Sequence, residues 1–188
     1  MGLYVHSLGE VPSGAKRNYY VYLLDYGWDE PLGEAVRANI TQMADHASKS
    51  NAAVIHGPRG THFADEVLSW HHINGEPADD LLPAILITTR HPRTFWESYN
   101  TEGHGPVPKD ALLLVPLKKI CSSACQVVEL IDRIFRDIKK EKKLPDFAVV
   151  KQMRRGVGRA VVDALILKPS VSGIGVDLKM LFSRPKAQ

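Results

Sequence analysis

The stretch VIHGPRGTHFADEVLSWHH, residues 54–72, decides the fold class. An apolar run ends at Gly57, a second glycine follows at Gly60, and apolar residues then recur at helical spacing from Phe63 onward. A short buried strand, a glycine-rich turn and an amphipathic helix, in that order, are typical of one repeating unit of an α/β fold.

The same alternation recurs along the rest of the chain. Further apolar strands are predicted at 18–27, 81–89 and 111–117, and helices are predicted from Pro31 to about Lys49 and after Ser123. Short apolar strands that alternate with amphipathic helices indicate a mostly parallel sheet covered on both faces. We therefore predict one three-layer, flavodoxin-like α/β domain over residues 1–188, with five or six strands.

Three segments outside this alternation carry predictions of their own. FAVVKQMRR (147–155) and RAVVDALILKP (159–169) flank GVG and predict an antiparallel hairpin near the C-terminus. GIGVDLKMLF (173–182) predicts a short final helix. RHPRTFWESYNTEGHGPVPKD (90–110) contains three prolines and two glycines and predicts a long connection with one helical turn.

Composition places the chain among ordinary globular proteins. It has 188 residues, 44% of them hydrophobic and 24% charged, with a formal net charge of +3. Its two cysteines fit a reducing compartment, and MGLYVHSLGE does not have the pattern of a signal peptide. No apolar run approaches the ~20 residues of a membrane span. We expect a cytoplasmic protein with no membrane partner.

The turn HGPRG is the first candidate binding element. Gly57 and Gly60 can adopt backbone angles that other residues avoid, and Arg59 supplies a fixed positive charge. Before a helix N-terminus, such a turn can hold a phosphate or carboxylate through its backbone amides. The turn matches neither the Walker pattern nor the dinucleotide fingerprint. A plain tight turn is the alternative.

Other candidate residues follow strands or lie in the long connection. In open α/β sheets ligands bind beyond the carboxyl ends of the strands. There, Asp25 is a candidate acid–base group, and Glu66 is a second one. Trp28 and Trp96 are candidates to stack a base, with His91 as a further ligand contact. Alternatively, the aromatic residues near His91 only pin the long connection to the domain.

Two charged clusters have simpler explanations. His62, Asp65 and Glu66 share one face of the predicted helix, but the ligand set is incomplete and a polar surface helix gives the same pattern, so we predict no metal site. The C-terminal third is locally basic, which fits a solvated face better than a nucleic-acid partner. The cationic residues that indicate this are Lys139, Lys140, Lys142, Lys143, Lys151, Arg154, Arg155 and Arg159.

The segment AVIHGPRGTHFADEVLSWHH…LLPAILITT resembles the middle of TIR domains, where a strand leads through a loop to a helix with a Ser-x-Trp-Cys or similar stretch. The likeness covers residues 53–89. It implies a nucleotide-binding, flavodoxin-like topology. After Trp70 no glutamate stands where the NAD-cleaving members carry one, and Glu66 lies one turn earlier.

Two classes of function remain open. The first is a nucleotide- or phosphoanion-binding α/β module that acts on NAD or a related nucleotide. The second is a non-catalytic interaction subunit of a larger protein or nucleoprotein assembly, or of a homo-oligomer. The glycine-rich turn and the tryptophans near predicted strand ends favour the first.

Overall fold

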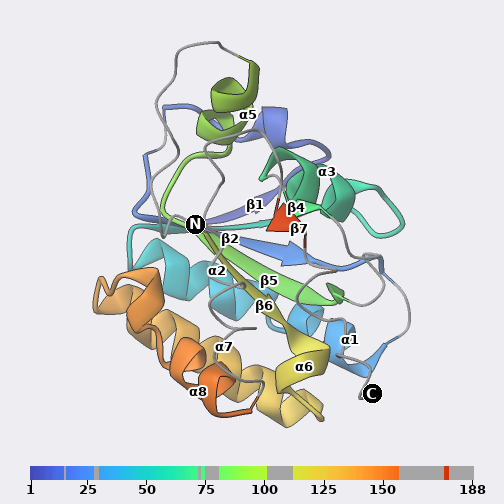
Figure 1. The fold of residues 1–188 in the computed structure, drawn as a ribbon, viewed down its shortest axis with the longest axis vertical. Helices are drawn as coiled ribbons and strands as arrows, with labels where there is room; N and C mark the ends of the chain where they lie inside the picture. Colours follow the sequence, from blue (N-terminus) through green and yellow to red (C-terminus); the bar gives the residue numbers. More distant parts are fainter. Residues whose placement is uncertain are drawn as a thin grey trace, which may run out of the picture.

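The protein folds around a five-stranded mixed sheet, with strand order β1-β3-β2-β5-β6 (Figure 1). The computed structural model describes residues 1–14, 16–27, 30–71, 73–74, 81–100, 112–156 and 176–177. The strands of the sheet are β1 (Gly2–Tyr4), β2 (Tyr19–Leu24), β3 (Ala52–His56), β5 (Ala84–Thr88) and β6 (Leu112–Pro116). The four apolar runs predicted as strands are all present as β2, β3, β5 and β6.

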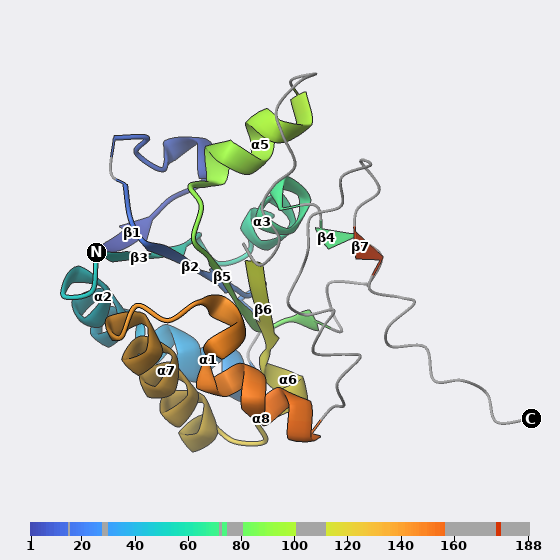
Figure 2. The same ribbon diagram turned by 60° about the vertical axis from the view of Figure 1, so that its left-hand side comes forward.

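Helices lie on both faces of this sheet (Figure 2). One face carries α1 (Pro31–Ala38), α2 (Ile40–Ser48), α7 (Ala124–Lys139) and α8 (Ala148–Gly156), and the other carries α3 (Phe63–Trp70) and α5 (Pro92–Asn100). The short helices are α6 (Leu117–Ile120) and the 3-10 turns η1 (Leu8–Glu10) and η2 (Leu144–Asp146). The prediction of an α/β fold is confirmed.

The prediction of a mostly parallel sheet is wrong. Strands β1, β3 and β2 run parallel, but β5 is antiparallel to both of its neighbours, β2 and β6. All five residues of β5 are buried, although the strand is antiparallel. Burial on both faces, and not strand direction, therefore produces the continuous apolar run AILIT that the prediction took as a sign of parallel pairing.

The predicted C-terminal hairpin is also wrong where the structure describes it. Residues 148–156 form α8 instead of a strand, and Val149, Val150 and Met153 on it are buried in the core. The buried carboxylate of Asp137 on α7 accepts a hydrogen bond from the Ala148 amide, which would otherwise lack a partner at the start of the helix. Residues 159–169, the other half of that hairpin, lie outside the described residues.

Near the C-terminus, the described part of the predicted final helix is a strand. Val176–Asp177 form β7, which pairs in parallel with β4 (Ile73–Asn74) in a separate two-stranded sheet. A pairing between residues a hundred positions apart leaves no local signal in the sequence. The long connection contains the predicted helical turn, which extends through the nine residues of α5, and residues 101–111 lie outside the described part of the chain.

The single helix predicted from Pro31 to Lys49 is two helices, because the chain breaks at Asn39. The Asn39 side chain donates a hydrogen bond to the carbonyl of Ala35 at 2.7 Å, and its backbone leaves the helical region. The break places Arg37, at the end of α1, beside Ile40, at the start of α2. Both residues line the cavity described below.

In the part of the chain that the structure describes, no helix is both long and apolar enough to cross a membrane.

Replacing Asp137 with Ala should lower the free energy of unfolding by about 1–3 kcal/mol, because the substitution leaves the partly buried Ala148 amide without this acceptor. The substitution also removes the partner of Lys142, whose ammonium lies 2.6 Å from the Asp137 carboxylate. Urea denaturation measures the change. Asp132 on the same helix, replaced with Ala, serves as the control and should change the free energy by no more than about 0.5 kcal/mol. Equal effects of the two substitutions would contradict this account of α8.

Candidate functional site

Two glycine-containing loops pack against each other at the carboxyl ends of β2 and β3. The first contains Asp25, Tyr26 and Gly27, and the amide of Gly60 in the second donates a hydrogen bond to the Tyr26 carbonyl at 3.3 Å. Gly27 has a φ of +80°, and a Cβ atom there would lie 3.0 Å from the Cβ of Arg59. Glycine is therefore needed at Gly27 for both its backbone angle and the close approach of the two loops.

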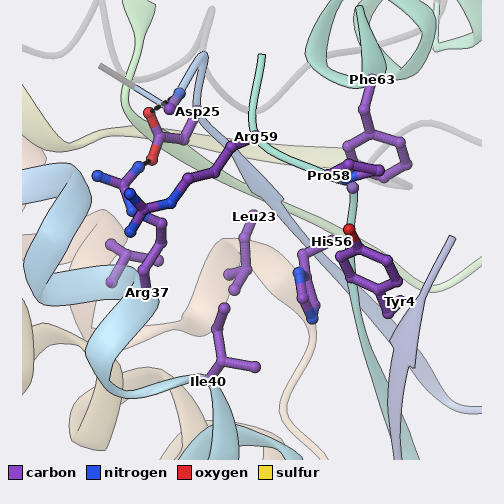
Figure 3. Close-up of a pocket in the computed structure, with 12 residues that line it drawn as sticks. Tyr4, Leu23, Asp25, Arg37, Ile40, His56, Pro58, Arg59 and Phe63 are labelled. Atoms are coloured by element: carbon purple, nitrogen blue, oxygen red, sulfur yellow. Dashed lines mark hydrogen bonds and ion pairs between the residues drawn. The ribbon is translucent and has the colours of Figure 1, made fainter. Parts of the chain in front are cut away.

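The two loops enclose a cavity of about 240 Å³ (Figure 3). Asp25, Arg37 and Arg59 gather at one end, and the rings of Tyr4, His56 and Phe63 gather at the other. Leu23 and Ile40 lie between the two ends. The remaining lining residues are Gly27, Val36, Gly57 and Pro58. The cavity thus combines an ionic end with an aromatic end, as small-molecule sites do when a few polar groups orient a largely apolar ligand.

Four charged side chains form a continuous chain of ion pairs at the ionic end. Asp25 pairs with Arg37, and the Arg37 guanidinium also lies 2.6 Å from the carboxylate of Glu34. The same Glu34 oxygen lies 3.3 Å from the guanidinium of Arg59. The two arginines, which come from different elements, therefore converge on one carboxylate.

Asp25 is fully engaged in holding this end together. One of its carboxylate oxygens accepts a hydrogen bond from the Gly27 amide at 2.9 Å, and the other pairs with Arg37. A Cβ atom on Gly33 would come within 3.0 Å of the carboxylate, so α1 approaches Asp25 closely at this residue. This environment fits a group that positions a cation better than one that exchanges protons.

The two guanidiniums influence each other electrostatically. Burial lowers the pKa of Arg37 from its usual value, and the positive charge of Arg59 lowers it further. Burial and repulsion by Arg59 both disfavour the charged form of Arg37. The carboxylates of Asp25 and Glu34 favour that charged form and so act against both causes. An additional anion between the two arginines would relieve the same repulsion.

His56 at the aromatic end escaped the sequence analysis. It is the last residue of β3, and its ring lies 5.0 Å from the ring of Tyr4 in an edge arrangement. Burial lowers the pKa of His56, while a hydrogen bond to the Gly57 backbone opposes this shift. The ring is therefore neutral at pH 7 and can accept or donate a hydrogen bond. The available signal was a titratable residue that ends an apolar strand directly before the turn GPRG.

Glu66, the second predicted acid–base residue, does not line the cavity. Its carboxylate accepts hydrogen bonds from the Ser7 hydroxyl at 2.7 Å and from the Leu8 amide at 3.1 Å. These bonds attach α3 to η1, on the opposite face of the sheet from α1 and α2. The geometry gives Glu66 a structural task, joining two segments far apart in the sequence.

The predicted aromatic contacts lie apart from the cavity. His91 approaches the Pro12 carbonyl at 3.2 Å and packs edge-on against Tyr20. Trp96 is 50% exposed and lies against Trp70, with ring centroids 6.1 Å apart. These contacts agree with the alternative that this segment is pinned to the domain. Trp28 lies outside the described residues.

The polar face of α3 also makes local contacts. Asp65 pairs with His62 at 3.0 Å and accepts a hydrogen bond from the Tyr26 hydroxyl at 2.6 Å. The second contact ties the loop after β2 to α3. Within the described segments, no group of three or more His, Cys, Asp or Glu side chains could hold a metal ion.

Comparisons with models of protein families, with curated proteins and with solved structures find no match for this chain. The resemblance to TIR domains therefore stays a prediction, and the site is interpreted from its own geometry.

Replacing Gly57 with Ala should destabilise the site, because a Cβ atom there would lie 2.4 Å from both Cβ and Cγ of Phe63. We expect a loss of about 1–3 kcal/mol in the free energy of unfolding, as for other overpacked positions. Gly14 is the matched control, since a Cβ atom there meets nothing within 4 Å. Its replacement with Ala should be neutral to within about 0.5 kcal/mol. A neutral result at Gly57 would show that the loop and Phe63 do not pack in this way.

Proposed function

We propose that the protein binds a small phosphorylated molecule in the cavity between the loops after β2 and β3. The observation that carries this proposal is the convergence of Arg37 and Arg59 at one end of a cavity whose other end is aromatic. Guanidinium groups bind phosphate through several charge-assisted hydrogen bonds, and the rings offer an apolar surface to the rest of the ligand.

The two arginines would have different tasks. Arg37 has a side chain only 15% exposed and is held by Asp25, so it is in place before any ligand arrives. Arg59 has a side chain 60% exposed and sits on the turn after β3, so it can reach toward the ligand. The neutral ring of His56 would contribute a hydrogen bond at the opposite end.

The size of the cavity limits the ligand class. A volume of about 240 Å³ lies just below the roughly 300–1,000 Å³ typical of sites for drug-sized ligands. A phosphoanion or a single nucleoside monophosphate fits this space better than a whole dinucleotide does. We therefore favour binding of a small phosphoanion over action on intact NAD.

Binding, rather than acid–base catalysis, is the function that the site supports best. Asp25 is committed to Arg37 and Gly27, and Glu66 is committed to Ser7 and Leu8. Neither carboxylate is free to transfer protons to a ligand in the cavity.

The cytoplasmic location stays a prediction.

The test is to measure binding of inorganic phosphate, AMP and NAD to the wild type and to Arg59→Gln by calorimetry. We expect phosphate and AMP to bind, and Arg59→Gln to weaken both by roughly tenfold or more, because a hydrogen bond to a charged group contributes about 1.5–3 kcal/mol. Arg93→Gln is the control: it makes the same change of charge at an exposed position on α5.

Two results would contradict the proposed function. One is the absence of binding of every anion to the wild type, which would favour the interaction-subunit alternative. The other is an equal loss of affinity in Arg59→Gln and Arg93→Gln, which would show that net charge, and not this cavity, attracts the anion.

A further inference from the structure

The carboxylate of Glu34 already bridges the two arginines at the ionic end of the cavity. One of its carboxylate oxygens lies 2.6 Å from Nη2 of Arg37 and 3.3 Å from Nη2 of Arg59. The protein therefore carries its own anion at the ionic end of the cavity. An external anion that binds Nη2 of either guanidinium must compete with this carboxylate.

The two contacts of Glu34 differ in strength. The contact with Arg37 is short and lies within one turn of α1. The contact with Arg59 is longer and joins side chains that are 47% and 60% exposed, for Glu34 and Arg59 respectively. Exposed ion pairs of this kind contribute little to stability. The contact between Arg59 and Glu34 can therefore break at little cost in free energy, while the contact between Arg37 and Glu34 remains.

We propose that Glu34 competes with the ligand for Arg59 and thereby weakens the binding of every external anion, so that a phosphate dianion still binds and a singly charged carboxylate no longer does so measurably. This inference rests on the function proposed above. When a free carboxylate replaces Glu34 at Arg59, the negative charge beside Arg59 stays the same. The ligand, however, loses its translational freedom. A phosphate dianion brings twice the charge and a third acceptor oxygen to the two guanidiniums, which offsets that cost.

The geometry also explains why this residue belongs to the site without lining the cavity. Glu34 lies on α1 between Gly33, which approaches Asp25, and Arg37, which Asp25 holds. The helix thus brings both the buried cation and its competing anion to the same end of the cavity. Lengthening or moving α1 would displace the two together.

The test is Glu34→Gln, which keeps the shape of the side chain and removes its charge. Binding of inorganic phosphate and of acetate at pH 7.5 is followed through the side-chain Nε–Hε resonance of Arg59. We expect Glu34→Gln to bind phosphate about fivefold more tightly and to bring acetate binding into the measurable range, because the same competing carboxylate is removed for both anions. In the wild type, acetate should bind far more weakly than phosphate.

Glu30→Gln is the matched control. Glu30 directly precedes α1, and its carboxylate pairs with Lys118 at 2.9 Å instead of with either arginine of the site. Each variant replaces one glutamate with glutamine, so the two have the same net charge. Glu30→Gln should leave the affinities for phosphate and acetate as they are in the wild type.

The outcomes separate this inference from the function on which it rests. If the wild type binds phosphate and Glu34→Gln binds it equally or less tightly, Glu34 supports the site and does not compete, and the inference fails alone. If Glu30→Gln strengthens binding as much as Glu34→Gln, a general charge effect replaces the inference. If neither the wild type nor Glu34→Gln binds phosphate, the proposed function fails as well.

Discussion

The ion pair between Asp25 and Arg37 is the interaction on which the site depends. A buried cation without a partner is strongly unfavourable, and the Arg37 side chain is mostly buried. Asp25 compensates it, and the Gly27 amide in turn fixes Asp25. The ionic end of the cavity is thus built from a strand end, a loop and a helix that a single carboxylate joins. Removing that carboxylate would take one charged partner from the mostly buried guanidinium and the hydrogen-bond acceptor from the Gly27 amide.

The arrangement of the sheet explains why the cavity lies where it does. Within the described five-stranded sheet, β1, β3 and β2 run parallel, and their carboxyl ends supply Tyr4, His56 and Leu23 to the cavity. Strand β5 runs antiparallel to β2. Its first residue, Ala84, pairs with Leu24, so β5 begins beside the carboxyl end of β2. The rule that ligands bind beyond the carboxyl ends of parallel strands therefore applies to one part of a mixed sheet.

The sequence was sufficient for strands β2, β3, β5 and β6 and for the turn after β3, but not for α8, β7 or the partners of individual side chains. The apolar runs of β2, β3, β5 and β6 are local signals, and so is the glycine turn that contains Arg59. Strand direction is not local, because a doubly buried antiparallel strand has the same composition as a parallel one. Arg37 was missed because it lies on a helix whose break at Asn39 turns it toward the loops. The roles of Asp25 and Glu66 depend on residues that only the fold brings close, namely Arg37 and Ser7.

The most direct test of the central claim is a titration of the labelled protein with inorganic phosphate, followed through its backbone amide resonances. The account predicts saturable shifts concentrated at Gly27, Gly57 and Gly60, the residues of the two packed loops. The competing location is a more basic groove between α2 and α7, lined in part by Lys49, Arg136 and Lys139. Shifts concentrated in that groove, or no saturable shifts near the two loops, would contradict the account.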